Sequence, residues 1–188
     1  DKIENIDSIN LVQEYCAGGT LFDYLERRDF VISEKMACRI IFQLCSVVSY
    51  LHSYNVIHRN LNLENIFMTD DTEYAEVRLI GFSNSKYLKP GEWCMEYNGL
   101  IGCAAPEILS NKPYSFSSDI WSIGLISYIL LSGINAFENT ENNKLIQEVT
   151  ERDVIFPEDV WEFCSKSGRF FVANLLSREP SKRMNFVE

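Results

Sequence analysis

The stretch Val56–Phe67, which reads VIHRNLNLENIF, constrains this chain more than any other part of it. It places a histidine–arginine pair and three asparagines, Asn60, Asn62 and Asn65, among apolar residues. An amide side chain cannot accept a proton near neutral pH, so Asn60 cannot serve as a general base. This stretch therefore bears directly on whether the chain is an enzyme at all.

Other motifs stand around this stretch in a definite order. A predicted strand at Ile9–Tyr15 is broken by the residues CAGG and precedes it. The residues CAAPE at positions 103–107, SSDIWSIGLISYILL at 117–131 and EPSKRM around Arg183 follow it. A tripeptide such as HRN alone would be weak evidence for membership of any protein family. The full set of motifs in this order is very specific evidence for one family.

On these residues, the chain from Ile9 to Phe186 resembles the large, C-terminal lobe of eukaryotic Ser/Thr protein kinases. Residues 58–65 match the catalytic loop H-R-D-L-x-x-x-N with one change, 104–107 contain A-P-E, and 119–124 give D-x-W-S-x-G. The segments LFDYL, PEIL, DIWSIGLISYILLSG and EPSKRM are most similar in sequence to the calcium- and calmodulin-dependent branch of these kinases. The resemblance implies an α+β protein-kinase-like fold, mainly α-helical with short strands.

The resemblance also implies a division of the chain. Residues 1–16 would be the end of the small lobe and the hinge, and residues 17–188 the large lobe, truncated before its last helix. A kinase small lobe carries a glycine-rich phosphate loop, a strand lysine and a helix glutamate. None of these precedes Ile9, so the small lobe is expected to be largely absent.

Local patterns predict the main elements. Ile9–Tyr15 is predicted to be a buried strand, and Thr20 to cap a helix. Apolar spacing predicts a long helix over Ser33–Tyr54. Alternation predicts a strand over Glu73–Ile80, with a short strand pair around Phe67 and Val77. Further helices are predicted through Leu145–Val149 and over Phe170–Leu176.

The positions that the resemblance assigns to chemistry are changed. Asn60 stands where the family has the Asp that receives the substrate proton, and Asn62 replaces the Lys that contacts phosphate. Gly81 replaces the metal-binding Asp of D-F-G and cannot ligate a metal. Asn65 is the remaining metal ligand, and one amide oxygen is a poor magnesium site. Arg59, which would pair with an activation-loop phosphate, is kept, but Lys86–Gly99 contains no Ser or Thr.

The resemblance further assigns a vestigial adenine and phosphate site. The backbones of Glu14 and Cys16 would face an adenine, with Asn65 and Phe67 beside the nucleotide. Phe67 puts a bulky ring where an aliphatic residue belongs. ATP and magnesium are the cofactors of the family, and both are expected to be lost or bound weakly. No cofactor is therefore expected in this chain.

The positions that the resemblance assigns to structure are retained. Phe82 is expected to pack beneath His58. Asp119 is expected to accept backbone hydrogen bonds from the catalytic loop. Arg183 is expected to pair with Glu107 in a buried ion pair. Outside these matches, His52 is interpreted as a capping or packing histidine.

Composition narrows the classes of partner. The 188-residue chain is 46% hydrophobic, with a formal charge of −10 and an isoelectric point near 4.7. This charge argues against nucleic acid or an anionic membrane as a partner. The run Ile120–Leu131 is too short to span a bilayer. Six cysteines without a CxxC pair, and only two histidines, predict buried reduced thiols rather than zinc, in a cytoplasmic protein.

Three hypotheses of function follow. The first is a pseudokinase, a regulatory or scaffolding module that binds a protein partner, such as an active kinase or a basic segment. The second is a weak or atypical ATP-dependent Ser/Thr protein kinase, in which water or a displaced carboxylate such as Glu64 stands in for Asn60. The third is a structural remnant without a partner site, which exposed apolar side chains on the substrate face would disfavour.

Overall fold

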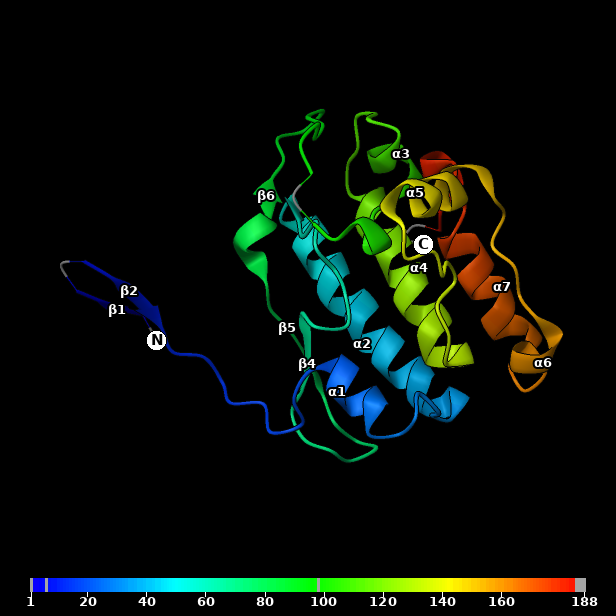
Figure 1. Cartoon of the computed structure of the whole chain (residues 1–188). Coiled ribbons are helices and arrows are strands. Elements are labelled where there is room, and N and C mark those ends of the chain that lie inside the picture. Colours follow the sequence, from blue (N-terminus) through cyan, green and yellow to red (C-terminus); the bar gives the residue numbers. More distant parts are fainter. Residues whose placement is uncertain (1, 6, 98, 185–188) are drawn as a thin grey trace.

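The structure, a computed structural model, describes residues 2–5, 7–97 and 99–184 (Figure 1). All statements on helices, strands and contacts refer to these residues. The predicted truncation before a last helix falls on residues 185–188, outside the described residues. The predicted division between residues 16 and 17 stays a prediction.

Three helices lie side by side at the centre of the molecule (Figure 1). They are α2 (Glu34–Ser53), α4 (Ser117–Ser132) and α7 (Lys166–Leu175). The hydroxyl of Ser33 caps α2 by accepting a hydrogen bond from the backbone N–H of Met36. Almost every residue of α4 is buried, as expected for a helix that is apolar on all sides. A Cβ at Gly124 would lie 2.7 Å from Leu176, so glycine permits the close packing of this region on α4.

Shorter helices surround this centre. The α-helices are α1 (Leu21–Glu26), α3 (Pro106–Leu109), α5 (Asn142–Glu151) and α6 (Glu158–Trp161). The 3-10 helices are η1 (Phe82–Asn84), η2 (Ile101–Cys103) and η3 (Pro180–Lys182). The predicted cap of α1 is confirmed, because Thr20 and Asp23 form a reciprocal capping box. The prediction for α7 was too short, since Ser165 caps a helix that starts before Phe170.

The strands form three antiparallel pairs. They are β1 (Lys2–Glu4) with β2 (Ile9–Leu11), β3 (Val56–Ile57) with β6 (Lys86–Tyr87), and β4 (Ile66–Met68) with β5 (Val77–Leu79). The predicted pair around Phe67 and Val77 is confirmed, with Phe67 opposite Arg78. The predicted strand Glu73–Ile80 was too long. Its first half is a turn, in which the Thr72 hydroxyl accepts a hydrogen bond from the Tyr74 N–H.

The prediction of a buried strand over Ile9–Tyr15 was wrong. Regular pairing ends at Leu11, and the exposed fractions of Leu11 and Tyr15 are 69% and 88%. The β1–β2 hairpin stands away from the helical body (Figure 1). Among the described residues β2 pairs only with β1, so no apolar surface covers these side chains.

Two apolar clusters make up most of the core. One joins α1, α2, α4 and the β4–β5 pair, and includes Leu21, Leu44 and Ile123. The other joins α4, α6 and α7 around Trp121 and Trp161. The molecule is thus mainly helical with short strands, as predicted.

Two further predictions concern the surface. By length and composition alone, α2 could cross a membrane, but a core helix passes the same test, and α2 packs against α4. All six cysteines are free, as predicted. The prediction that they are buried was wrong for most of them, since only Cys94 is fully buried and Cys38 is exposed.

Candidate functional site

The loop of residues 58–65 between β3 and β4 is held in place by one buried carboxylate. Asp119, in the first turn of α4, is 1% exposed. Its two oxygens accept hydrogen bonds from the backbone N–H groups of His58 and Arg59, both at 2.9 Å. The ring of His52 from α2 adds a contact of 2.8 Å from Nε2 to the same carboxylate. The role predicted for Asp119 is confirmed, and His52 is a packing residue rather than a helix cap.

His58 links this loop to the segment that follows β5. Its Nε2 lies 2.8 Å from the carbonyl oxygen of Ile80, which can only accept, so Nε2 carries the proton. Its Nδ1 accepts a hydrogen bond from the Asn60 N–H at 3.3 Å. The predicted packing of Phe82 on His58 is confirmed, with ring centroids 5.1 Å apart. Burial lowers the pKa of His58, against the opposite effects of the Ile80 carbonyl and Asp119, so the ring is held neutral.

The three asparagines of the loop bond to one another. The Asn62 amide nitrogen donates to the backbone and side-chain oxygens of Asn60, at 3.1 and 3.2 Å. Its oxygen accepts from the backbone N–H groups of Glu64 and Asn65. The Asn65 amide nitrogen donates to the Asn60 carbonyl at 2.9 Å. These contacts make a neutral amide cluster, and Asn62 turns back into the loop instead of reaching outward.

Gly81 lies directly against this cluster. Its φ is +80°, in the left-handed region that favours glycine. A Cβ at this position would lie only 2.6 Å from Cγ and Oδ1 of Asn65. The amide of Asn65 therefore occupies the space that the Cβ of any side chain at residue 81 would need. Among the described residues, no group of three or more His, Cys, Asp or Glu side chains is arranged to hold a metal ion.

Main-chain carbonyl groups accept the hydrogen bonds of the Arg59 guanidinium. It donates to the carbonyl oxygen of Asn84 and, at 3.3 Å, to that of Glu96. Nearby, Lys86 forms an ion pair with Glu92 at 2.8 Å, and this pair raises the pKa of the lysine. The described residues that follow β6 are thus held by a carboxylate contact at Glu92 and a carbonyl contact at Glu96. A turn at Pro90-Gly91 is closed by the hydrogen bond from the Glu92 N–H to the Lys89 carbonyl.

The residues assigned to the adenine side lie around the β4–β5 pair. Glu14 forms an ion pair with Arg78, with 2.7 Å between Oε2 and Nε, and Arg78 is paired with Phe67 across the strands. Phe67 is partly buried and also bridges to Thr20. The thiol of Cys16 approaches only the nearby Glu14 carbonyl, at 4.0 Å, among the contacts described for it. Their assignment to a nucleotide site stays a prediction.

The predicted pair of Arg183 and Glu107 is confirmed. Both guanidinium nitrogens lie 2.6 Å from the carboxylate oxygens, in a bidentate arrangement. Both side chains are almost fully buried. Arg183 also donates to the backbone carbonyls of Ser117, Ser177 and Arg178, so it ties the end of the described chain to the start of α4.

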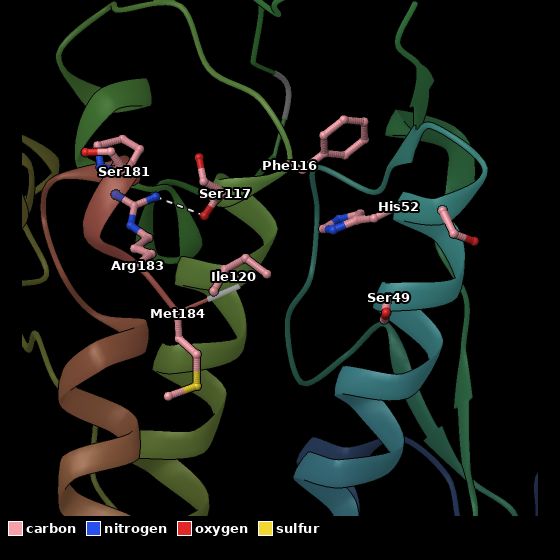
Figure 2. Close-up of a pocket in the computed structure, with 10 residues that line it drawn as sticks. Ser49, His52, Phe116, Ser117, Ile120, Ser181, Arg183 and Met184 are labelled. Carbon is pink, nitrogen blue, oxygen red and sulfur yellow. Dashed lines mark hydrogen bonds between the residues drawn. The ribbon is translucent and has the colours of Figure 1, made fainter. Parts of the chain in front are cut away.

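A pocket of about 510 Å³ lies beside this pair rather than at the asparagine cluster. Figure 2 shows His52 from α2 facing Ser117 and Ile120 from α4 across it, with Met184 below. None of the residues assigned to catalysis, metal or adenine lines it. The pocket therefore belongs to the structural side of the molecule and gives no support to a nucleotide site.

Sequence reasoning missed two contacts at this site. The fit of the Asn65 amide against Gly81 joins residues on different elements, and no spacing in the sequence signals it. The Lys86–Glu92 pair joins two residues of one segment, and no motif in the sequence signals it.

Comparison with known proteins agrees with this geometry. A family model described as the protein kinase domain matches residues 1–188, so the chain belongs to the protein kinase family. The recognition of the family and the predicted fold class are confirmed.

Individual relatives are similar over nearly the whole chain. CDPK-related kinase 3 of Arabidopsis thaliana is 35% identical over 191 residues, which cover 100% of this chain and 31% of that protein. A probable myosin light chain kinase of Dictyostelium discoideum is 38% identical over 185 residues, covering 97% of this chain and 47% of that protein. A CDPK-related protein kinase of Daucus carota is 35% identical over 191 residues, covering 100% and 31%. The chain thus spans less than half the length of these relatives.

Proposed function

We propose that this kinase-family domain does not catalyse phosphoryl transfer and acts instead as a protein-binding regulatory or scaffolding module, a pseudokinase. The observation that carries the proposal is the packing of the Asn65 amide in the space beside Gly81. The site is closed on itself at the point where a metal-binding carboxylate is needed. The relatives are named as kinases, and the proposed loss of activity would set this chain apart from what those names state.

The proton-transfer step supports this proposal. Asn60 has no basic atom near neutral pH, and its side-chain oxygen already accepts a hydrogen bond from Asn62. Loss of a general base costs about 10²–10⁴-fold in rate. In protein kinases, with turnover of roughly 1–100 per second, such a loss alone leaves slow catalysis.

The metal site supports it further. Mg²⁺ prefers several oxygen ligands, usually carboxylates and phosphates, in octahedral geometry. Of the assigned positions, Asn65 has an amide oxygen and Gly81 has no side chain at all. The metal clamp stabilises developing charge by several kcal/mol. Losing both the base and the clamp leaves at most a trace of activity, with ATP and magnesium bound weakly or not at all.

The proposed partner is a protein, such as an active kinase or a basic segment, in the cytoplasm. The segment from β6 to η2 exposes several large apolar side chains, namely Tyr87, Trp93, Met95 and Leu100. Such side chains favour a contact surface over a remnant without a partner. The net charge of −10 favours basic partners and disfavours nucleic acid and anionic membranes.

A weak or atypical ATP-dependent Ser/Thr kinase is the second candidate, and the kinase names of the relatives favour it. It needs a substitute for the base at Asn60. Glu64 is exposed and stands on the same loop, but only its backbone N–H contacts the amide cluster in the hydrogen bonds described. This candidate therefore requires a rearrangement of the loop on substrate binding.

A phosphotransfer assay on the full-length protein separates the two candidates. We expect no transfer from ATP to a basic Ser/Thr peptide above background, with the Asn65→Ala variant giving the same rate. Transfer that Asn65→Ala abolishes would assign activity to this site and overturn the proposal. The Asn65→Ala variant also controls for a contaminating kinase, because the substitution would leave the activity of a contaminant unchanged.

The partner role needs its own test. Replacement of Trp93 and Met95 together by serine should abolish binding to a partner recovered from cells and purified. Phe163→Ser is the matched control, because Phe163 is equally apolar and 87% exposed on a different part of the molecule. If both variants lose partner binding equally, or if neither variant loses it, a partner site on the β6–η2 segment is contradicted.

A further inference from the structure

The loop that joins β4 to β5, residues 69–76, carries an exposed tyrosine and lies at the lower edge of the view in Figure 1. Tyr74 is 66% exposed, and its hydroxyl has no hydrogen bond among the described residues. Its backbone N–H donates to the Thr72 hydroxyl at 3.2 Å, so a turn holds the backbone while the ring stays at the surface. A free hydroxyl on a surface loop is accessible to a modifying enzyme.

The residues on both sides of Tyr74 are acidic. Four carboxylates lie within four positions of it in the sequence, at Asp70, Asp71, Glu73 and Glu76. Glu73 is exposed, and the side chains of Asp71 and Glu76 are 56% and 63% exposed although each pairs with an arginine. An enzyme with a basic substrate groove would bind such a segment by charge complementarity.

A pocket of about 220 Å³ lies between this loop and α2. Tyr74 and Glu73 line it from the loop, and Lys35 and Arg39 line it from α2. The guanidinium carbon of Arg39 lies 4.8 Å from the centroid of the Tyr74 ring. Nη1 of Arg39 also donates to the Glu73 carbonyl at 3.2 Å, which keeps the guanidinium beside the tyrosine.

The two cations of this pocket are accessible and have no carboxylate partner. Both Lys35 and Arg39 are exposed, and neither forms an ion pair among the described residues. A phosphate on Tyr74 would be tethered beside them, so charge-assisted hydrogen bonds could form without a second molecule. The carboxylate of Glu73 would oppose the phosphate, but two cations outweigh this one acid in the pocket wall.

We propose that Tyr74 is a phosphorylation site for a tyrosine kinase that binds acidic segments, and that Arg39 and Lys35 hold the phosphate. That enzyme would transfer the γ-phosphoryl group of ATP to the phenol oxygen of Tyr74. ADP is the leaving group, and the phenol proton passes to the base of that enzyme. The modification would tie the β4–β5 loop to α2. The proposal does not depend on whether this domain itself transfers phosphate.

The order in which tyrosines are modified is the first test. The full-length protein is incubated with ATP and a purified tyrosine kinase that prefers acidic peptides, and mass spectrometry follows each tyrosine with time. We expect Tyr74 to be modified before Tyr15 and Tyr54. Tyr15 is the control for exposure, because it is 88% exposed but has only one acidic residue, Glu14, within four positions. Tyr54 is 61% exposed and has none.

Two results of this assay would overturn the site. One is modification in the order of exposure, with Tyr15 first. The other is an unmodified Tyr74 while the same enzyme phosphorylates a synthetic glutamate–tyrosine copolymer, which shows that the enzyme is active.

Phosphorus-31 NMR of the phosphorylated protein tests the role of the two cations, with Tyr74→Phe assigning the signal. A phosphate ester on tyrosine has a second pKa of about 6, and nearby cations lower it because they favour the doubly charged form. The pKa should therefore be lower in the folded protein than in urea. Arg39→Gln and Lys35→Gln should each raise it toward the value in urea.

Lys144→Gln is the matched charge control, because Lys144 is exposed and lies outside the pocket. It should leave the pKa of the phosphate unchanged. The same pKa in the folded and the unfolded protein would overturn the role of Arg39 and Lys35. An equal rise in all three variants would overturn it too, since only the overall charge would then matter.

Discussion

The loop of residues 58–65 has two different sides. On the side that faces α4, a buried carboxylate holds the loop. On the side that faces Gly81, neutral amide groups fill the space. Asp119 accepts two backbone hydrogen bonds and contacts His52 on the first side. On the second side Asn60, Asn62 and Asn65 satisfy one another. One loop thus has a charge that positions its backbone on one side and only neutral amides on the side where we propose that catalysis is lost.

The largest effect is expected on the structural side, from Glu107→Gln. This change leaves Arg183 buried without a full countercharge, and breaking a buried pair in this way costs about 3–5 kcal/mol. Urea unfolding monitored by tryptophan fluorescence measures the loss. The double variant Glu107→Leu with Arg183→Met should recover part of it. A loss below 1 kcal/mol in Glu107→Gln would show that the pair does not hold the fold.

Two isosteric substitutions, one from carboxylate to amide and one from amide to carboxylate, compare the two sides of the loop directly. Asp119→Asn replaces one accepting oxygen by a donor that faces backbone N–H groups, and should cost about 1–3 kcal/mol. Asn60→Asp retains the oxygen that accepts from Asn62 and should change the stability by only about 0.5 kcal/mol. The free energy of unfolding of each variant is the measurement. Equal costs would remove the distinction between the two sides.

Gly81→Asp tests whether the closed site can be reopened. The backbone at residue 81 is in the left-handed region, where a side chain costs roughly 1–2 kcal/mol, and the new Cβ would also lie 2.6 Å from the Asn65 amide. We expect lower stability and no magnesium-dependent phosphotransfer. Gly81→Ala is the control, since it has the same backbone cost and the same Cβ contact with Asn65 but no carboxylate. Magnesium-dependent transfer by Gly81→Asp alone would mean that the site is open after all.

The smallest effect concerns His58. Burial lowers its pKa below the ordinary value of 6.5, so the folded protein binds fewer protons than the unfolded chain near this pH. The stability from this group is complete above about pH 6.5 and falls as the pH drops from there toward the folded pKa. NMR titration of the histidine rings should find His58 mainly neutral at pH 6.5. A pKa above 6.5 would contradict its buried, neutral state.

Much of this organisation was predictable from the sequence. The order of the motifs identified the family, and the contacts of Asp119 with the loop and of Arg183 with Glu107 followed from it. The wrong prediction for Ile9–Tyr15 has a physical reason, because a run of apolar residues is buried only if another element covers it. The fit of Asn65 beside Gly81 was not predictable, since it depends on how two separate segments pack.

The central claim is that the side of the loop facing Gly81 no longer binds metal and nucleotide together. A thermal-shift titration of the full-length protein with ATP, with and without magnesium, tests it most directly. A ligand present at 100 times its dissociation constant stabilises the native state by about 2.7 kcal/mol and raises the melting temperature. We predict no shift that requires magnesium. A clear rise in melting temperature that appears only when magnesium is added would contradict the account.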